Sequence, residues 1–265
     1  MNDSGFEDKA LIGRFIAVRE RLAAAELMAG REPGEVQLVA VSKWHPASRL
    51  AVLARYMESQ AAKPETKPDS LRDAKTNALH IIFSENYLQE ALGKQDELAG
   101  AELSCRWHFS GHLQSNKARQ AFGRFELLHT LDSLSLAQNL QKEFDKRLAA
   151  SATAAPQRVL LQVNIGREAQ KSGLMPEDLP EFIDRVRQLT GVAMQGLMCL
   201  PPIADEAEAS RPYFAGLRQL RDKLESGCGL KLPLLSMGMS HDFEVAVQEG
   251  ANLVRVGTDI FGPRT

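Results

Sequence analysis

The chain has 265 residues, of which 44% are hydrophobic and 25% charged, and its formal net charge is −2. This composition is that of an ordinary globular protein and excludes disordered, collagen-like and coiled-coil chains. A near-neutral charge also argues against a dedicated nucleic-acid binder, which usually carries a strongly basic face. The length accommodates either one α/β barrel or two ordinary domains.

The sequence contains no pattern for secretion or membrane insertion. Its first ten residues are polar and acidic, without the apolar stretch of a signal peptide. No run of about 18 apolar residues, the length that a membrane-spanning helix needs, occurs in the chain. The three cysteines, Cys105, Cys199 and Cys228, are odd in number and far apart, which is typical of reduced thiols. We therefore expect a cytoplasmic protein.

The predicted elements alternate along the chain between helices and strands. An amphipathic helix is predicted over 6–29, with Gly30 as its stop, and the charged, proline-containing segment 58–77 is predicted to be a surface loop or insertion. Short apolar runs typical of strands occupy 36–42, 79–83, 105–110, 125–131, 158–165, 192–200, 232–238 and 252–257. Helical patterns lie between them, among them 46–56, 133–150, 176–189, 207–226 and 240–249.

This order of elements predicts an α/β fold, a single (β/α)8 TIM barrel with an extra N-terminal helix. Eight strands separated by seven helical segments match the composition of that barrel. The alternative is a doubly wound open sheet, which should show a GxGxxG pattern after its first strand. Lys43-Trp44-His45-Pro46 stands there instead, which favours the barrel. We expect one domain over 1–265.

Polar residues follow nearly every predicted strand. The carboxyl ends of the strands form the active face of a parallel barrel. These positions are occupied by Ser42 and Lys43, Ser84 to Asn86, Ser110 to His112, Asp132 and Ser133, Asn164, Met198 and Cys199, Ser236 to Ser240, and Arg255 to Thr258. Polar groups that converge on one end from around the ring predict a binding site there.

Lys43 is the most informative of these residues because it ends an otherwise apolar strand. Desolvation in a barrel mouth would favour the neutral amine. A neutral amine attacks an aldehyde to form a Schiff base. The alternative is a lysine whose ammonium group reaches solvent from a loop.

Two turns of small residues offer places for an anion. Residues 236–240 join the seventh strand to a helix, with Ser240 expected as its N-cap, and Gly257-Thr258 follows the strand that contains Arg255. Helix N-termini present free N–H groups to phosphates, and barrels typically bind phosphate with these two loops. Ordinary capping and turn formation is the alternative. Together with Lys43, the turns suggest a phosphorylated aldehyde cofactor.

Metal binding has little support in the sequence. His108 and His112 are four residues apart, but Gly111 and the predicted strand over 105–110 are incompatible with a helical zinc motif. No third ligand has a fitting spacing, and neither a P-loop nor a hydrolase elbow is present. We expect no metal site.

Eight segments of the chain carry a wider resemblance, which runs from about residue 10 to the C-terminus. They are AVSKWHPAS, FSENYLQEAL, WHFSGHLQSNKAR, LHTLDSLSLA, VLLQVNIGREAQKSG, GLMCLPP, LSMGMSHDFEVAVQEGANLVRVGT and IFGPR. The sequence closely resembles the pyridoxal phosphate homeostasis protein family. It departs from that family at Ser84, where glycine is usual, at Ser110, where an apolar residue is usual, and in the length of 58–77.

The resemblance implies a fold-type III pyridoxal 5′-phosphate (PLP) protein, a barrel like the N-terminal domain of alanine racemase. It implies that Lys43 holds PLP as a Schiff base and that Asn86 lies near the ring hydroxyl. Phosphate contacts are implied for Ser236, Met239, Ser240, Gly257 and Thr258. Arg255 would lie near the pyridine nitrogen, where it would discourage protonation and weaken the electron sink.

The resemblance implies a role in intracellular vitamin B6 homeostasis without established turnover, with PLP-dependent apo-enzymes as partners. The alternative is a PLP-dependent amino-acid racemase, which needs a base on each face of the Cα carbanion. Lys43 could serve one face, but none of Tyr56, Tyr87 and Tyr213 is an evident second base, and we expect no second domain. A barrel enzyme without cofactor is a third hypothesis. We expect a monomer that binds neither membrane nor specific nucleic acid.

Overall fold

The computed structural model describes residues 3–61, 81–151 and 153–263. Most of the predicted loop 58–77 therefore lies outside the described residues. Its first four residues continue a helix that ends at Ala61, so the helix is longer than the predicted 46–56.

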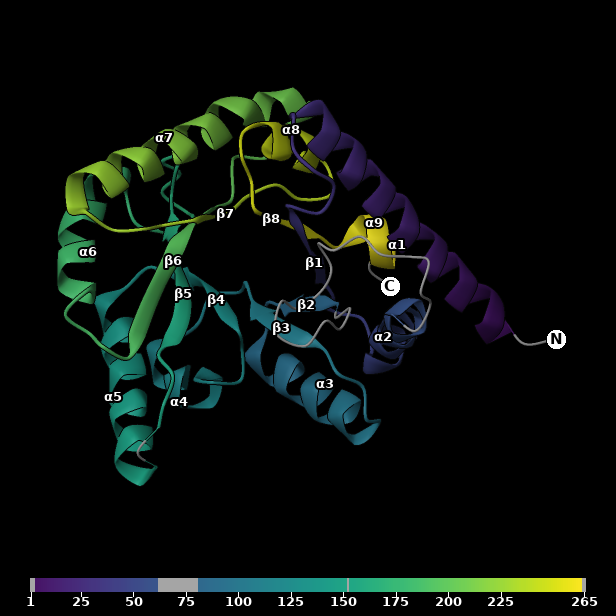
Figure 1. Ribbon diagram of the computed structural model, residues 1–265, viewed down its shortest axis with the longest axis horizontal. Coiled ribbons are helices and arrows are strands. Elements are labelled where there is room, and N and C mark those ends of the chain that lie inside the picture. The colour runs from purple at the N-terminus through teal and green to yellow at the C-terminus, as the bar shows by residue number, and fades with distance from the viewer. Residues whose placement is uncertain (1–2, 62–80, 152, 264–265) are drawn as a thin grey trace. The chain divides into compact units, whose positions relative to one another are not determined.

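The elements alternate as the sequence predicts (Figure 1). The strands of the described residues are β1 (Gln37–Val41), β2 (Ile82–Glu85), β3 (Arg106–Phe109), β4 (Leu127–Leu131), β5 (Gln157–Val163), β6 (Val192–Cys199), β7 (Leu234–Ser236) and β8 (Leu253–Val256). Their helices are α1 (Asp3–Met28), α2 (Ala47–Ala61), α3 (Leu88–Gly100), α4 (Ala118–Ala121), α5 (Leu134–Ala150), α6 (Leu179–Val186), α7 (Arg211–Cys228), α8 (Phe243–Gln248) and α9 (Thr258–Phe261).

The strands follow one another from β1 to β8 in a closed barrel, which confirms the predicted fold class. A doubly wound sheet would instead place later strands on both sides of the first. The leading helix α1 is the predicted extra element. Among the described helices, none is long and apolar enough to cross a membrane.

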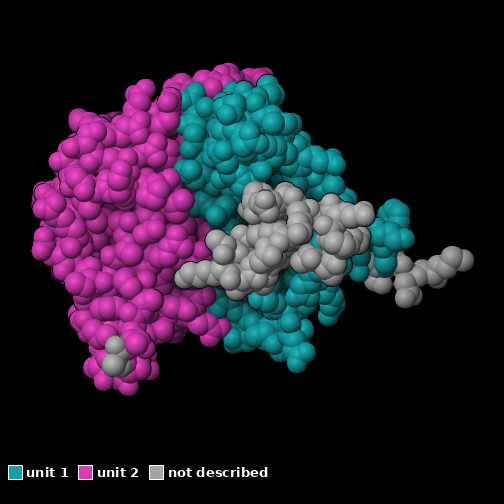
Figure 2. All heavy atoms as spheres, in the orientation of Figure 1, with its two compact units in different colours: residues 1–106, 238–265 teal, residues 107–237 magenta. Residues whose placement is uncertain are grey.

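The chain divides into two compact units, which Figure 2 colours separately. Unit 1 comprises residues 1–106 and 238–265, and unit 2 comprises residues 107–237. In unit 1, β1 pairs in parallel with both β2 and β8. In unit 2, β3 to β7 pair in parallel in chain order. A single domain over 1–265 stays a prediction.

Helix α1 shows how the apolar pattern determines burial in unit 1. Its buried side chains recur at helical spacing: Leu11, Phe15, Val18, Leu22 and Ala25. The helix packs on α2, α8 and α9. It ends at Met28, and Gly30 follows with a φ of 69°, so the predicted stop is confirmed. This face of α1 supports the two short helices that follow the candidate phosphate turns.

Candidate functional site

Seven of the eight predicted cofactor-binding residues belong to unit 1, where they are carried by or follow neighbouring strands. Strand β1 lies between β8 and β2 in the parallel sheet, so the carboxyl ends of the three strands lie on one edge. Lys43 follows β1, Asn86 follows β2, and Gly257-Thr258 follows β8. The fold thus gathers the predicted lysine and one predicted phosphate turn at this edge.

Lys43 sits in a tight turn between β1 and α2. Its side chain is half-buried. The turn is closed by the His45 N–H, which donates to the Ser42 carbonyl at 3.1 Å. Trp44 has a φ of 69°, a left-handed conformation that costs a residue other than glycine about 1 to 3 kcal/mol. The backbone next to Lys43 is therefore held in a conformation that its surroundings must stabilise.

A buried ion network beside this turn was missed by the sequence analysis. The Lys94 Nζ donates to Glu85 Oε1 at 2.6 Å, to Glu90 Oε1 at 2.6 Å and to the Ser42 carbonyl at 2.8 Å. The Ser42 hydroxyl donates to the same oxygen of Glu85 at 2.5 Å. Burial raises the pKa of the Glu85 carboxyl, against the opposing effect of the bonds from Lys94 and Ser42. The spacing of Glu90 and Lys94 on one helix face was the available signal.

Hydrogen bonds connect the loop before α8 to the end of β8. The Arg255 N–H donates to the Gly238 carbonyl at 3.0 Å, and the Asp259 N–H approaches the Ser240 hydroxyl at 3.5 Å. Gly238 has a φ of 89°, and a Cβ there would lie 2.6 Å from the Cβ of Ala246, so only glycine fits. The loops that carry Met239, Ser240, Gly257 and Thr258 form one connected structure.

The predicted N-cap of α8 is wrong. The helix begins at Phe243 with Asp242 before it, two residues later than a cap at Ser240 requires. Residues 239–242 form a turn instead, because the Asp242 carboxylate accepts the Met239 N–H at 2.8 Å. This change leaves the Ser240 hydroxyl directed at α9 rather than at the start of α8.

The residues at these loops fit a phosphate. Ser240 and Thr258 contribute hydroxyl groups that can donate to an anion. The Met239 and Asp259 N–H groups already donate to the Asp242 carboxylate and to the Ser240 hydroxyl, so the hydroxyl groups are the donors that these loops offer. A Cβ on Gly257 would lie 3.1 Å from the Val41 carbonyl oxygen, so the backbone at this edge would have to shift by a few tenths of an ångström to admit a side chain. Arg255 is buried within β8, level with Val39 of β1, and supplies a fixed positive charge.

The eighth predicted residue, Ser236, ends β7 in unit 2 and belongs to a buried polar chain. Its hydroxyl lies 2.9 Å from Nδ1 of His129, whose Nε2 lies 3.0 Å from Nδ1 of His108. All three residues are buried. The sequence analysis compared His108 with His112, but His112 is exposed. No group of three or more His, Cys, Asp or Glu side chains that could hold a metal ion occurs in the described ranges.

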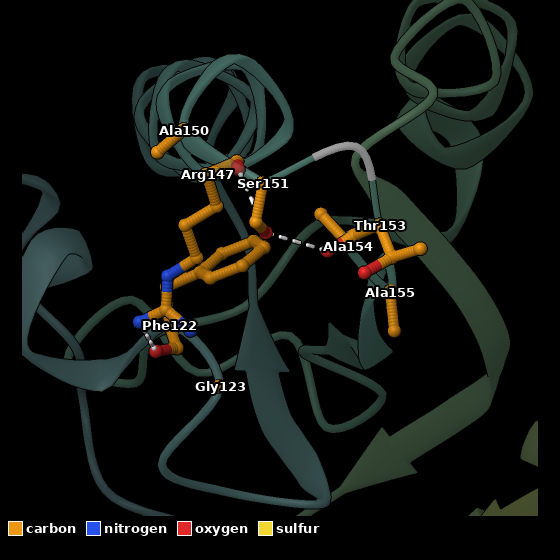
Figure 3. A pocket seen from close by; sticks show the side chains of 8 residues that line it. All are labelled: Phe122, Gly123, Arg147, Ala150, Ser151, Thr153, Ala154 and Ala155. Carbon is orange, nitrogen blue, oxygen red and sulfur yellow. Dashed lines mark hydrogen bonds between the residues drawn. The ribbon is translucent and has the colours of Figure 1, made fainter.

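Two of the surface hollows lie in different units. One in unit 1, of about 480 Å³, is lined by residues of the Lys43 turn and of α3, including Trp44, Glu90 and Lys94. The other, in unit 2, has a volume of about 440 Å³ and is shown in Figure 3. There the Arg147 guanidinium covers the Phe122 ring at 4.8 Å and donates to the Phe122 carbonyl. No predicted cofactor-binding residue lines the second hollow.

The comparisons with known proteins show the family of the chain. Residues 71–265 match the family model described as alanine racemase, N-terminal domain. The pyridoxal phosphate homeostasis protein of Pseudomonas aeruginosa is 43% identical over 247 residues, which cover 93% of each chain. The protein of that name from Escherichia coli K12 is 35% identical over 257 residues, which cover 93% of this chain and 94% of the relative.

Solved structures give the same result for the fold. PipY of Synechococcus elongatus, solved with PLP bound, is 34% identical with a TM-score of 0.69 and covers 92% of this chain and 100% of its own. Alanine racemase of Corynebacterium glutamicum is 17% identical with a TM-score of 0.61 and covers 93% of this chain and 60% of its own. The likeness to the racemase concerns the fold alone.

Proposed function

Because this chain belongs to the pyridoxal phosphate homeostasis protein family, we propose that it binds PLP on Lys43 and takes part in intracellular vitamin B6 homeostasis without catalytic turnover. The observation that carries the proposal is the position of Lys43 after β1, at the sheet edge that also carries Asn86 and Gly257-Thr258. This edge combines an amine with a phosphate-binding donor set within unit 1.

Each residue has a distinct role in this proposal. When bound, the cofactor would supply an aldehyde, which a neutral lysine amine can hold covalently. Lys43 provides that amine, and Asn86 binds the ring hydroxyl. The phosphate is bound by the five other predicted residues of the two loops, which are Ser236, Met239, Ser240, Gly257 and Thr258.

Arg255 supports binding without turnover. A guanidinium keeps its charge at all accessible pH values, and a buried positive charge disfavours a second one beside it. Next to the pyridine nitrogen, Arg255 therefore opposes ring protonation and limits electron withdrawal from bound substrates.

An amino-acid racemase would in addition need a second base. Tyr56 packs edge-on against Phe15 with ring centroids 6.3 Å apart, and Tyr87 is exposed beside Trp44.

The test is PLP uptake followed by absorption, with borohydride reduction and peptide mapping. We expect wild type to gain a visible absorption band and a pyridoxyl group on the peptide that contains Lys43. Lys43→Ala should lose both. The control Lys146→Ala, which removes an exposed lysine of α5, should keep both. A wild type that takes up no PLP, or equal labelling of Lys43→Ala, would overturn the proposal.

Turnover is tested separately by the loss of optical rotation of several L-amino acids. We expect rates with the PLP-loaded protein to stay at those of free PLP. Clear turnover above that background would identify a racemase instead. Ser236→Ala and Asn86→Ala should weaken PLP uptake in both cases, because both hypotheses use the same cofactor site.

The proposal extends to location and partners. None of Cys105, Cys199 and Cys228 forms a disulfide, which supports a reducing compartment such as the cytoplasm. We propose a monomer that passes PLP to apo-enzymes. Light scattering of the loaded protein tests the monomer, and activation of a PLP-dependent apo-enzyme in the presence of a PLP scavenger tests the transfer.

A further inference from the structure

We propose that Lys94, together with Glu85 and Glu90, is a positioning residue that clamps the backbone on both sides of Lys43 and so presets the lysine for the cofactor. The inference rests on the proposed function of Lys43. It assigns no chemistry to Lys94 itself. It concerns residues that all belong to unit 1.

The first half of the clamp acts before Lys43. Lys94 Nζ donates to the carbonyl of Ser42, the residue preceding Lys43, at 2.8 Å. The Ser42 hydroxyl also donates to Glu85 Oε1, which accepts from Lys94 as well. The carbonyl and the hydroxyl of Ser42 are therefore both held by the Lys94–Glu85 ion pair.

The second half acts after Lys43. The N–H of Trp44 donates to Glu90 Oε1 at 2.7 Å, and that oxygen accepts from Lys94 at 2.6 Å. Trp44 is the residue with the left-handed backbone, which needs such external support. Lys94 thus reaches the residue before Lys43 directly and the residue after it through one carboxylate.

The same network reaches a second predicted ligand. Glu85 is the last residue of β2 and is followed directly by Asn86. The side chains of Lys94 and Glu85 are 6% and 0% exposed, so solvent screens their attraction little. Their pairing fixes the end of β2 against α3 and against the turn after β1.

The network is built for geometry more than for stability. Glu85 Oε2 is buried and has no hydrogen-bond partner within the described residues, while Oε1 accepts from two donors. A buried ion pair commonly contributes less to stability than well-packed apolar side chains of similar volume. The three Nζ protons of Lys94 are matched by three acceptors, so its amine is not available to the cofactor.

The test compares Lys94→Met with the double variant Glu85→Gln/Lys94→Met, which removes both buried charges. Circular dichroism first verifies that each variant is folded. PLP affinity is then measured by absorption titration, and stability by urea unfolding. We expect Lys94→Met to weaken PLP binding by about tenfold or more. The double variant should regain stability but not affinity, because the Ser42 carbonyl then has no bond from Lys94 and Glu90, the acceptor of the Trp44 N–H, is no longer held by Lys94.

Rescue and control variants separate positioning from general damage. Lys94→Arg should restore part of the affinity because it keeps the charge. Lys146→Met, which breaks the exposed pair with Glu143, should bind PLP as wild type does. Wild-type PLP affinity in Lys94→Met would overturn this inference but not the proposed function. So would a PLP affinity that recovers in step with stability in the double variant. A wild type that binds no PLP would overturn the proposed function as well.

Discussion

A Cβ placed on Gly257 would lie 3.1 Å from the carbonyl oxygen of Val41, a backbone atom that has no freedom to rotate away. The φ of Gly257 is −116°, so a side chain there is disfavoured by this tight approach and not by the backbone conformation. This contact joins the end of β8 to the end of β1, two residues before Lys43. It keeps one of the two predicted phosphate turns close to the lysine.

Gly257→Ala should therefore separate the two strand ends. We expect PLP binding to weaken about tenfold and the free energy of unfolding to fall by about 1 to 3 kcal/mol, as for other overpacked sites. Absorption titration and urea unfolding measure the two effects. Gly227→Ala is the control, because nothing lies within 4 Å of a Cβ there. Unchanged PLP affinity in Gly257→Ala would contradict this account of the edge.

Arg21 of α1 joins the helices that follow the two predicted phosphate turns. It donates to Asp259 Oδ2 of α9 at 2.6 Å and to Glu244 Oε1 of α8 at 2.8 Å. Its side chain is 44% exposed, so each pair contributes below about 1 kcal/mol. We expect Arg21→Ala to weaken PLP binding by about two- to fivefold. Added salt should screen the two ion pairs in wild type and so reduce the difference in PLP affinity between wild type and the variant. Arg167→Ala, which breaks an exposed pair in unit 2, should leave binding unchanged.

Ser236 should contribute to stability as well as to binding. Ser236→Ala removes the hydroxyl that lies 2.9 Å from His129, which is buried. Leaving a buried polar atom without this partner costs about 1 to 3 kcal/mol. We expect lower stability in urea and weaker PLP uptake. Ser133→Ala, which removes the N-cap of α5, should cost about 1 kcal/mol without changing PLP affinity. Equal PLP affinities for the two variants would remove Ser236 from the site.

Cys105 should be unreactive in the folded protein. Burial, with a smaller effect from Glu58, raises the pKa of its thiol to about 12. At about pH 8 only about one thiol in 10⁴ is then ionised, and the thiolate is the reactive form. Iodoacetamide labelling followed by peptide mapping should modify Cys105 slowly in buffer and rapidly in urea. Similar rates in the two conditions would show that the thiol is not shielded.

Glu85 should affect how stability depends on pH. Burial raises the pKa of its carboxyl above the value of about 4.3 expected in the unfolded chain. The folded state then binds more protons between these two pKa values, so stability falls as pH rises through that window. Glu85→Gln should remove this part of the slope in urea unfolding measured from pH 4 upwards. The exposed Glu97→Gln should retain the wild-type slope.

Much of the fold was predictable because burial leaves a periodic trace in the sequence. The run 36–42 and the buried positions of α1 indicated a strand and a helix without reference to distant residues. Lys43, Gly257 and Thr258 were predicted at strand ends because parallel strands that alternate with helices bring their carboxyl ends to one edge. The position of α8 was predicted less well, because a local turn, in which the Asp242 carboxylate accepts the Met239 N–H, replaced the expected cap at Ser240.

Pairs of side chains that are distant in sequence were decided only by the tertiary structure. Lys94 lies 52 residues from Ser42, and Ser236 lies 107 residues from His129. Local periodicity does not encode such pairs, because the sequence around each residue indicates only whether that residue is exposed or buried, not which distant side chain it contacts. The sequence by itself determined the strands, the edge and the candidate lysine. Only the tertiary structure decided which buried charges hold that lysine in place. A buried charge costs free energy unless it is paired, and the packing of the chain determines which partner lies within hydrogen-bond distance.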